Sequence, residues 1–292
     1  MGSLTVLDRG LFTTIQDKGR VGYRKFGIPV SGVMDEVSFL SANKLVGNPE
    51  NTPVLECTLK GGKYRFESNT VITITGALMS PKINGSTVEM NTSIKVEQGD
   101  VLELGFAQKG CRAYVAIKGN WDIETVLGSY STYTRASFGG FEGRALRKGD
   151  EIRWQDSESD FRAQSLPKGE IPYFSSKISV DFIPGPEWDW LNKKEQEIFL
   201  SSSFVVDSKS NRMGIRLSSD VQLSTEKQEM SSSGVIPGII QLPPSGDPII
   251  LMNDAQTVGG YPRIGKVLDR YLDRLAQIPP NGIVRFKKSE GF

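Results

Sequence analysis

Short apolar segments recur along nearly the whole chain, and turn residues separate them. Residues 71–75 read VITIT, are β-branched at every position and end at Gly76. Similar segments lie at 93–97, 101–104, 112–117, 151–154, 179–183, 234–241 and 248–252. Many short strands at this spacing are typical of barrels and sandwiches, not of sheets whose strands alternate with helices. The sequence therefore predicts a mostly β fold, with a hairpin joining 93–97 to 101–104 through the turn at Gly99.

Three segments have the features of short helices. Residues 35–46 follow the turn-like Ser31-Gly32 pair and stop at Gly47. Residues 186–200 begin at a proline, which the first turn of a helix tolerates. The third segment has its apolar residues at helical spacing on one face: Val267, Leu268, Tyr271, Leu272 and Leu275. We expect all three helices to pack against sheets.

A polar segment near the middle of the chain predicts two halves. The 292 residues can bury one large core or two modest ones. Residues 155–177 contain Pro167 and Pro172 and lack a clear period, which is typical of a linker. We therefore predict β-barrel halves at 1–160 and 175–292, with a boundary that strands can cross.

The balance of charge limits the class of partner. Lys and Arg number 35 against 34 Asp and Glu, so no overall field favours nucleic acid or an anionic membrane. The spacing of Cys57 and Cys111 argues against a disulfide scaffold and against a zinc site. No signal-peptide pattern opens the chain, and no apolar segment reaches membrane-spanning length. We expect a cytoplasmic protein with a small-molecule ligand and no membrane or nucleic-acid partner.

The chain contains no histidine. This excludes Ser-His-Asp and Cys-His catalysis, His-ligated metals and imidazole as the proton carrier. Any chemistry must use carboxylates, Lys, Arg, Tyr, amides, hydroxyls or a bound cofactor. We predict no metal site in this chain.

Residues 13–35 form the first cluster of residues that could bind a ligand or take part in catalysis. Glycines and a proline punctuate a stretch that contains Gln16, Asp17, Arg20 and Asp35. Loops that expose donors and acceptors on a rigid scaffold often bind ligands. An equal alternative is a surface loop with an exposed Asp17–Arg20 ion pair, which contributes under about 1 kcal/mol.

Two further clusters combine glycine with polar residues. Residues 132–144 (TYTRASFGGFEGR) suit close approach to a ligand or another chain, or form a bent barrel corner. Around Gly214, the residues Asn211, Arg212 and Arg216 suit carboxylate or phosphate recognition, or simply flank a strand. Because Arg212 lies in a glycine-flanked loop, Arg212→Ala is expected to abolish turnover and leave the fold intact.

Residues 260–266 (GYPRIGK) match the spacing of a phosphate-binding loop, G-x-x-x-x-G-K. Val267 stands where such a loop needs Ser or Thr, and Pro262 removes a backbone N–H. These departures argue against a nucleotide loop. A helix beginning after Arg263 and Lys266 remains a candidate anion site through its dipole and charge.

Segments along nearly the whole chain resemble one family. They are GLFTTIQDKGR (10–20), VGNP (46–49), LE (55–56), FGGFEGRAL (138–146), NRMG (211–214), GVIPG (234–238) and DAQTVGGYP (254–262). Together they resemble the family of 5-oxoprolinase C subunits, also described as allophanate hydrolase subunit 2, Kip antagonist or biotin-dependent carboxyltransferase. Asn211 stands where Asp is expected, and Val258 where Thr is usual.

The resemblance implies two cyclophilin-like β-barrel domains and a complex with the B and A subunits of 5-oxoprolinase. It also implies ATP-dependent opening of 5-oxoproline to glutamate, with ATP and Mg²⁺ used by the complex. A lactam carbonyl is a poor electrophile, and phosphorylating its oxygen makes it open to attack by water; cations must then surround the phosphate. The residues implied to be catalytic are Arg20, Asp35, Arg212 and Gln256. Those implied to bind substrate are Gln16, Asp17, Asn43, Asn211, Tyr261, Arg263 and Lys266.

Two other functions fit the same resemblance. One is transfer of a carboxyl group from carboxybiotin to urea or another amide, which requires a separate carrier because the chain has no biotin-carrier signature. The other is a regulator that binds a kinase-inhibitor protein.

Overall fold

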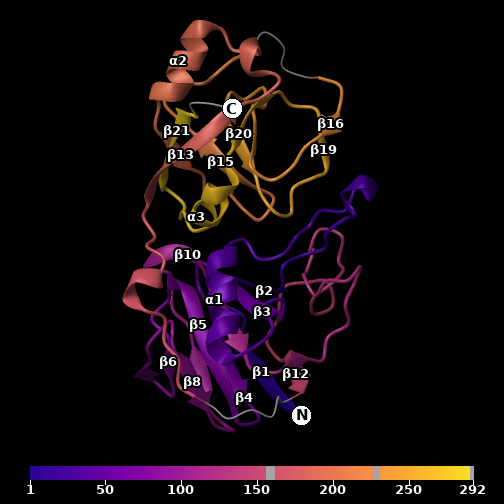
Figure 1. Ribbon diagram of the computed structural model, residues 1–292, viewed down its shortest axis with the longest axis vertical. Helices are drawn as coiled ribbons and strands as arrows, with labels where there is room; N and C mark the ends of the chain where they lie inside the picture. Colours follow the sequence, from indigo (N-terminus) through magenta and orange to yellow (C-terminus); the bar gives the residue numbers. More distant parts are fainter. Residues whose placement is uncertain (156–161, 226–229, 290–292) are drawn as a thin grey trace. The chain divides into compact units, whose positions relative to one another are not determined.

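The computed structural model describes residues 1–155, 162–225 and 230–289, and strands dominate it (Figure 1). The predicted mostly β fold class is confirmed. Two compact units divide the chain: Met1–Arg20 with Ser31–Phe174, and Val21–Val30 with Ser175–Phe292. The predicted first half, 1–160, includes Val21–Val30, which the structure groups with the second unit. No helix of the described residues is long and apolar enough to cross a membrane.

The first unit consists mainly of two antiparallel sheets. The seven-stranded sheet contains, in spatial order, β11 (Asn120–Trp121), β12 (Glu151–Gln155), β1 (Gly2–Asp8), β4 (Lys63–Phe66), β9 (Val101–Glu103), β6 (Lys82–Ile83) and β7 (Ser86–Thr87). The five-stranded sheet contains β2 (Phe12–Gln16), β3 (Val54–Thr58), β10 (Lys109–Ile117), β5 (Thr70–Leu78) and β8 (Ser93–Val96).

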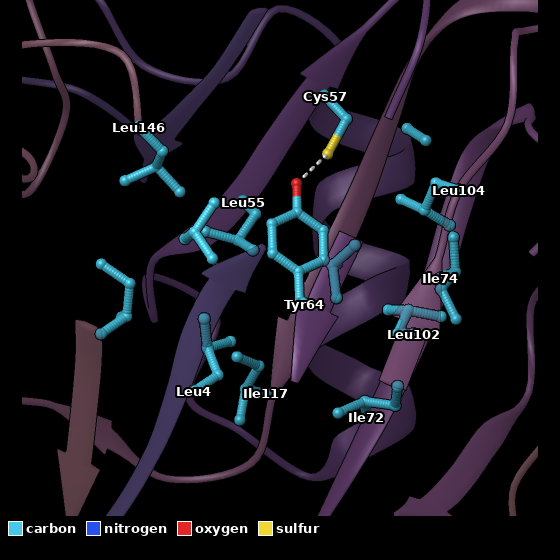
Figure 2. Close-up of a cluster of buried hydrophobic side chains, with 14 of the residues drawn as sticks. Leu4, Leu55, Cys57, Tyr64, Ile72, Ile74, Leu102, Leu104, Ile117 and Leu146 are labelled. Carbon is cyan, nitrogen blue, oxygen red and sulfur yellow. Dashed lines mark hydrogen bonds between the residues drawn. The ribbon is translucent and has the colours of Figure 1, made fainter. Parts of the chain in front are cut away.

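One face of the five-stranded sheet is apolar. Ile15, Leu55, Val115 and Ile74 occupy successive positions across β2, β3, β10 and β5, and all four are fully buried. They share one core with apolar residues of the seven-stranded sheet such as Leu4 (Figure 2). Alternation at period two along each strand therefore supplies the core between the two sheets.

A buried thiol and a phenol meet inside this core. The Tyr64 hydroxyl lies 3.4 Å from the Cys57 sulfur, and both residues are fully buried (Figure 2). Burial raises the pKa of the Cys57 thiol and raises that of Tyr64 well above its usual range. Both groups are therefore neutral at physiological pH, and Cys57 is a packing residue without a reactive thiolate.

Helix α1 (Glu36–Val46) covers the opposite face of the five-stranded sheet (Figure 1). The Asp35 carboxylate caps its first turn by accepting from the backbone N–H of Ser38 at 3.0 Å, and Gly47 ends it in the left-handed conformation. The predicted helix at 35–46 is confirmed.

A closed barrel forms most of the second unit. Around the barrel lie β13 (Lys177–Pro184), β20 (Arg263–Val267), β17 (Ile239–Gln241), β18 (Ile249–Leu251), β15 (Gly214–Ser218), β14 (Phe204–Val206) and β21 (Ile283–Lys288). A separate two-stranded ribbon joins β16 (Ser233–Gly234) to β19 (Val258–Gly259). Aromatic rings of Phe182, Phe199 and Phe286 pack together at 4.5 to 6.0 Å between ring centres.

Two predicted helices differ from the observed ones. A 3-10 turn at Trp188–Trp190 precedes α2 (Lys193–Ser201), so the second helix begins later than residue 186. The third, predicted from Val267 onward, is only α3 (Leu272–Ala276) after a 3-10 turn. Val267 instead pairs with Phe182 in the barrel wall, because closing the barrel requires β20 to reach β13.

The predicted hairpin between 93–97 and 101–104 is wrong, although its turn exists. The Asp100 N–H donates to the Glu97 carbonyl at 3.0 Å. However, β8 pairs with β5 in one sheet, and β9 pairs with β4 and β6 in the other. The turn therefore connects two sheets, a long-range arrangement that local turn chemistry does not encode.

The predicted segment 234–241 is interrupted, since only its ends belong to β16 and β17. The predicted linker, 155–177, includes 156–161, which lie outside the described residues. Beyond them, the Ser93 N–H donates to the Gln164 carbonyl at 2.8 Å, and the Leu166 N–H donates to the Asn91 carbonyl at 2.9 Å. This part of the linker therefore adds to the first unit instead of merely connecting the halves.

Candidate functional site

Asp17 anchors two loops of the first unit to each other. Its buried carboxylate accepts from the hydroxyls of Ser129 at 2.6 Å and Ser131 at 2.5 Å, and from the N–H groups of Tyr130 at 2.9 Å and Gly19 at 2.8 Å. Four donors from the protein fill most of what a carboxylate can accept. These hydrogen bonds show that Asp17 fixes the conformation of the loop that follows β2.

Arg20 is buried under the glycine-rich segment 137–143. Its guanidinium donates to the Ser131 carbonyl and lies 4.8 Å from the centre of the Phe138 ring. A Cβ at Gly139 would overlap the Ser131 backbone oxygen and lie 2.7 Å from Arg20 Nη2, and the φ of Gly139 is 70°, so glycine is required at this position. The interpretation of Asp17 and Arg20 as an exposed ion pair is wrong, because both side chains are almost completely buried.

Gln16 completes this cluster at the end of β2. Its Nε2 donates to Thr14 Oγ1 at 2.9 Å and to the Thr132 carbonyl at 3.2 Å. Its Oε1 is buried and has no hydrogen-bond partner within the described residues. The fold thus brings Gln16, Asp17 and Arg20 together, and these buried side chains connect the loop after β2 to the loop around residues 129–132.

Asp35 belongs to a buried polar group beneath α1. The Tyr114 hydroxyl accepts from the Asp35 N–H at 2.9 Å and donates to Glu56 at 3.0 Å. Burial, aided by the negative charges of Glu56 and Asp35, raises the pKa of Tyr114 well above its usual range. Tyr114 therefore stays protonated, and Asp35 serves here as a helix cap.

Asn43 has a comparable supporting task on α1. Its Nδ2 donates to the Thr52 carbonyl at 2.8 Å, and its Oδ1 accepts from Asn48 at 3.3 Å. These bonds fix the loop that follows the helix, and the Asn43 side chain is fully buried. Asn43 is therefore a scaffold residue of the first unit.

Arg212 and Asp254 form a bidentate ion pair in the second unit. Arg212 Nε and Nη2 donate to the two Asp254 oxygens at 2.8 and 3.0 Å, and each side chain is 7% exposed. Asn211 lies one position earlier, where its Oδ1 accepts from the Met213 N–H at 2.8 Å. The geometry ties the Arg212 loop to the segment that follows β18.

Arg263 is paired in the same way with Glu187. Its Nε and Nη2 donate to the carboxylate at 2.9 and 2.8 Å, and its backbone N–H donates at 3.0 Å. Nearby, Gln256 Nε2 donates to Gln241 Oε1 at 3.2 Å. Gln241 Nε2 is buried without a partner among the described residues.

Lys266 does not lie at a helix N-terminus. It is a residue of β20, and its ammonium pairs with Asp269 at 2.5 Å. The anion site expected from a helix dipole after Arg263 and Lys266 is therefore wrong, and the 260–266 segment forms no phosphate-binding loop. Tyr261 lies just before β20 and is 39% exposed.

A pocket of about 440 Å³ lies within the second unit beside the β16–β19 ribbon. Its lining consists of Arg24, Lys25, Gly27, Gly234, Val235, Ile236, Thr257 and Val258. This volume suits a small organic ligand, and the walls combine apolar and cationic groups. Sequence reasoning missed Arg24 and Lys25, although two adjacent cations between Gly22 and Gly27 were a usable signal.

A second hollow, of about 390 Å³, lies in the first unit over the glycine-rich segment 137–143. Its lining includes the acidic residues Asp122, Glu124 and Glu142, together with Phe138 and Phe141. It thus has the opposite charge to the pocket beside β16 and β19. Within the described residues, no three acidic or cysteine side chains gather as a metal site.

Comparisons with known proteins agree along almost the full length of the chain. The family model described as carboxyltransferase domain, subdomain A and B, matches residues 26–288. The 5-oxoprolinase C subunit of Escherichia coli (strain K12) is 37% identical over 283 residues, which cover 97% of this chain and 90% of the relative. The 5-oxoprolinase C subunit of Haemophilus influenzae is 34% identical with the same coverage.

Larger fungal proteins contain a similar region. The urea amidolyase of Lachancea kluyveri is 33% identical over 96% of this chain, which spans 16% of that protein. The crystal structure of Kluyveromyces lactis urea carboxylase superposes with a TM-score of 0.91 at 31% identity. That match covers 97% of this chain and 27% of the urea carboxylase chain.

Proposed function

The chain belongs to the family of carboxyltransferase domains with subdomains A and B, and we propose that it acts as the C subunit of a 5-oxoprolinase complex. The observation that carries the proposal is the match to two proteins of that name, of which the chain spans 90%. The urea amidolyase relative is almost as similar, but the chain spans only 16% of it.

In this proposal the complex opens 5-oxoproline to glutamate and this chain binds and orients the cyclic amide. The structure offers a small pocket lined by both cationic and apolar residues. Opening a lactam requires the ring to be held while its carbonyl is activated and water approaches. The chain is proposed to act in the cytoplasm and only together with the B and A subunits.

ATP and Mg²⁺ belong to the proposed reaction of the complex as a whole. The residues of the 260–266 segment do not fit a nucleotide phosphate, because Lys266 lies in β20 and pairs with Asp269. This segment is therefore not assigned to ATP in the proposed reaction.

Reconstitution tests the proposal. The chain is mixed with its B and A partners, and glutamate released from 5-oxoproline is measured with and without ATP, and with this chain omitted. We expect glutamate only when all three proteins and ATP are present. Absence of ATP-dependent glutamate from the complete mixture would contradict the proposal.

Carboxyl transfer to urea is the second candidate, supported by the superposition on urea carboxylase. It requires carboxybiotin on a separate carrier protein. The same purified chain is therefore assayed with a biotinylated carrier, a biotin carboxylase, urea and bicarbonate. Biotin-dependent carboxylation of urea, without glutamate formation in the first assay, would favour this function.

A further inference from the structure

We propose that Arg24 and Lys25 form a carboxylate-recognition site within the second unit, and that its ligand is a small amide carrying a carboxylate. This inference rests on the proposed function and specifies its substrate class. It assigns a binding role to two residues that the sequence motifs did not single out.

The loop that presents the two cations has a defined conformation. A 3-10 turn spans Arg24–Phe26, and Gly27 closes it with φ of 82° while its N–H donates to the Arg24 carbonyl at 3.0 Å. Only glycine adopts such a φ without strain. The loop therefore holds the side chains of Arg24 and Lys25 beside the β16–β19 ribbon, whose residues line the same pocket.

Arg24 is partly desolvated, and no described residue supplies it with a counter-charge. Its Nη2 donates to the Val235 carbonyl, whereas its Nη1 is buried and has no partner within the described residues. Burial lowers the pKa of the Arg24 guanidinium. A buried donor without an acceptor is costly, so a ligand that supplies a negatively charged acceptor is favoured at this point.

No acidic side chain lines the pocket, in the part of the chain that the structure describes. Lys25 is exposed, and its ammonium lies 5.1 Å from the centre of the Phe26 ring instead of beside a carboxylate. The two cations thus produce a local positive potential that no described residue of the pocket lining neutralises. Such a site attracts an anion more strongly than a neutral molecule.

The other walls suit a small ring attached to that anion. Ile236 and Val258 are 45% and 58% exposed, and Thr257 contributes the one side-chain hydroxyl among the lining residues. 5-Oxoproline matches these walls, because it has a carboxylate for the cations, a compact ring for the apolar residues and a polar lactam. Urea and 2-pyrrolidinone have no charge for the cations, and acetate and inorganic phosphate have no ring for the apolar wall.

Equilibrium binding to the full-length chain tests this assignment. Dissociation constants are measured by calorimetry or NMR titration for 5-oxoproline, 2-pyrrolidinone, acetate, inorganic phosphate and urea. We expect 5-oxoproline to bind at least about tenfold more tightly than every other probe, because it alone makes both contacts. Equal binding of 5-oxoproline and 2-pyrrolidinone overturns the carboxylate site, and equal binding of phosphate or acetate overturns the amide specificity.

Substitutions locate the site. Lys25→Gln and Arg24→Gln are each expected to weaken 5-oxoproline binding by about tenfold and to leave 2-pyrrolidinone binding unchanged. Arg24→Lys keeps the charge and should recover part of the loss. Lys194→Gln is the matched control, because it removes an exposed cation from α2 outside the pocket. The Lys25 side chain makes no hydrogen bond to other described residues, so Lys25→Gln should reduce binding without affecting folding. Wild-type affinity for 5-oxoproline in both Lys25→Gln and Arg24→Gln overturns the proposal.

Assays of the assembled complex separate this inference from the proposed function. A wild-type complex that releases glutamate, with an unchanged KM for 5-oxoproline in both glutamine variants, rejects the carboxylate site and leaves the function standing. A complex without glutamate formation, in which the chain alone still binds 5-oxoproline through Lys25, rejects the function and leaves the site standing.

Discussion

Two arginines of the second unit lie in glycine-rich segments and have opposite electrostatic surroundings. Arg212 is buried in a bidentate pair with Asp254. Arg24 donates to a backbone carbonyl and faces no carboxylate among the described residues. A neutralised arginine supports the fold, whereas an unopposed one at a pocket is available to an anionic ligand. The counter-ion, not the neighbouring glycine, therefore distinguishes the structural arginine from the one open to a ligand.

Substitution of Arg212 should lower the free energy of unfolding more than any other change considered below. Arg212→Ala leaves the Asp254 carboxylate buried without its bidentate partner, so we expect a loss of about 3–5 kcal/mol in the free energy of unfolding. This revises the expectation that the variant keeps its fold, because the Arg212 side chain is buried against Asp254. Urea-induced unfolding measures the loss. The double variant Arg212→Met with Asp254→Leu should recover much of it, and a change below about 0.5 kcal/mol in the single variant would remove the distinction from Arg24.

The ion pair of Glu187 and Arg263 should make the free energy of unfolding depend on pH. The hydrogen bonds from the Arg263 guanidinium hold the pKa of Glu187 below its usual 4.5, against the opposing effect of burial. A lowered pKa in the folded state means that the stabilisation is present above pH 4.5 and is lost as pH falls through the lowered value.

We therefore expect Glu187→Gln to lose about 1.5–3 kcal/mol near neutral pH, and to approach wild-type stability in acid. Urea unfolding at several pH values from about 7 to about 3 measures the difference. Glu197→Gln on the exposed side of α2 is the control. A stability difference that stays constant down to the lowest pH would show that the carboxylate charge is not responsible.

Removing the Arg24 charge should change stability little. Arg24→Gln loses the bond to the Val235 carbonyl but also relieves a desolvated cation, so the two effects oppose each other. We expect a net change below about 1 kcal/mol by urea unfolding, together with the loss of binding described above. A loss as large as that of Arg212→Ala would make Arg24 a structural residue.

The smallest effect is expected at Lys18, which is paired but exposed. Its ammonium lies 2.7 Å from Glu50, and the Glu50 side chain is 78% exposed. Water and salt screen such a pair, so Lys18→Ala should leave the thermal midpoint unchanged within error. A measurable drop in the midpoint would show that pairing alone, without burial, stabilises this protein.

Much of the fold could be predicted because its signals are local. The helix at 35–46 is indicated by the turn-like Ser31-Gly32 pair that precedes it and by the glycine that ends it, which are local features of the sequence. The helix expected from Val267 begins later than predicted, because Val267 fits a strand as well and its pairing with Phe182 places it in β20. The hairpin failed for the same reason, since β8 and β9 join strands far away in sequence.

The amino-acid sequence limits the chemistry open to this protein, because the absence of histidine leaves guanidinium, ammonium, amide, hydroxyl and carboxylate groups. A series of motifs in the sequence also indicates the family. Which cations are neutralised depends on the fold. The partners of Arg212 and Arg263 lie 42 and 76 positions away along the chain, a separation at which no local pattern links two residues. A charge stabilises the fold or remains open to a ligand according to what folding places beside it, and no carboxylate lies beside Arg24 and Lys25 among the described residues of their pocket.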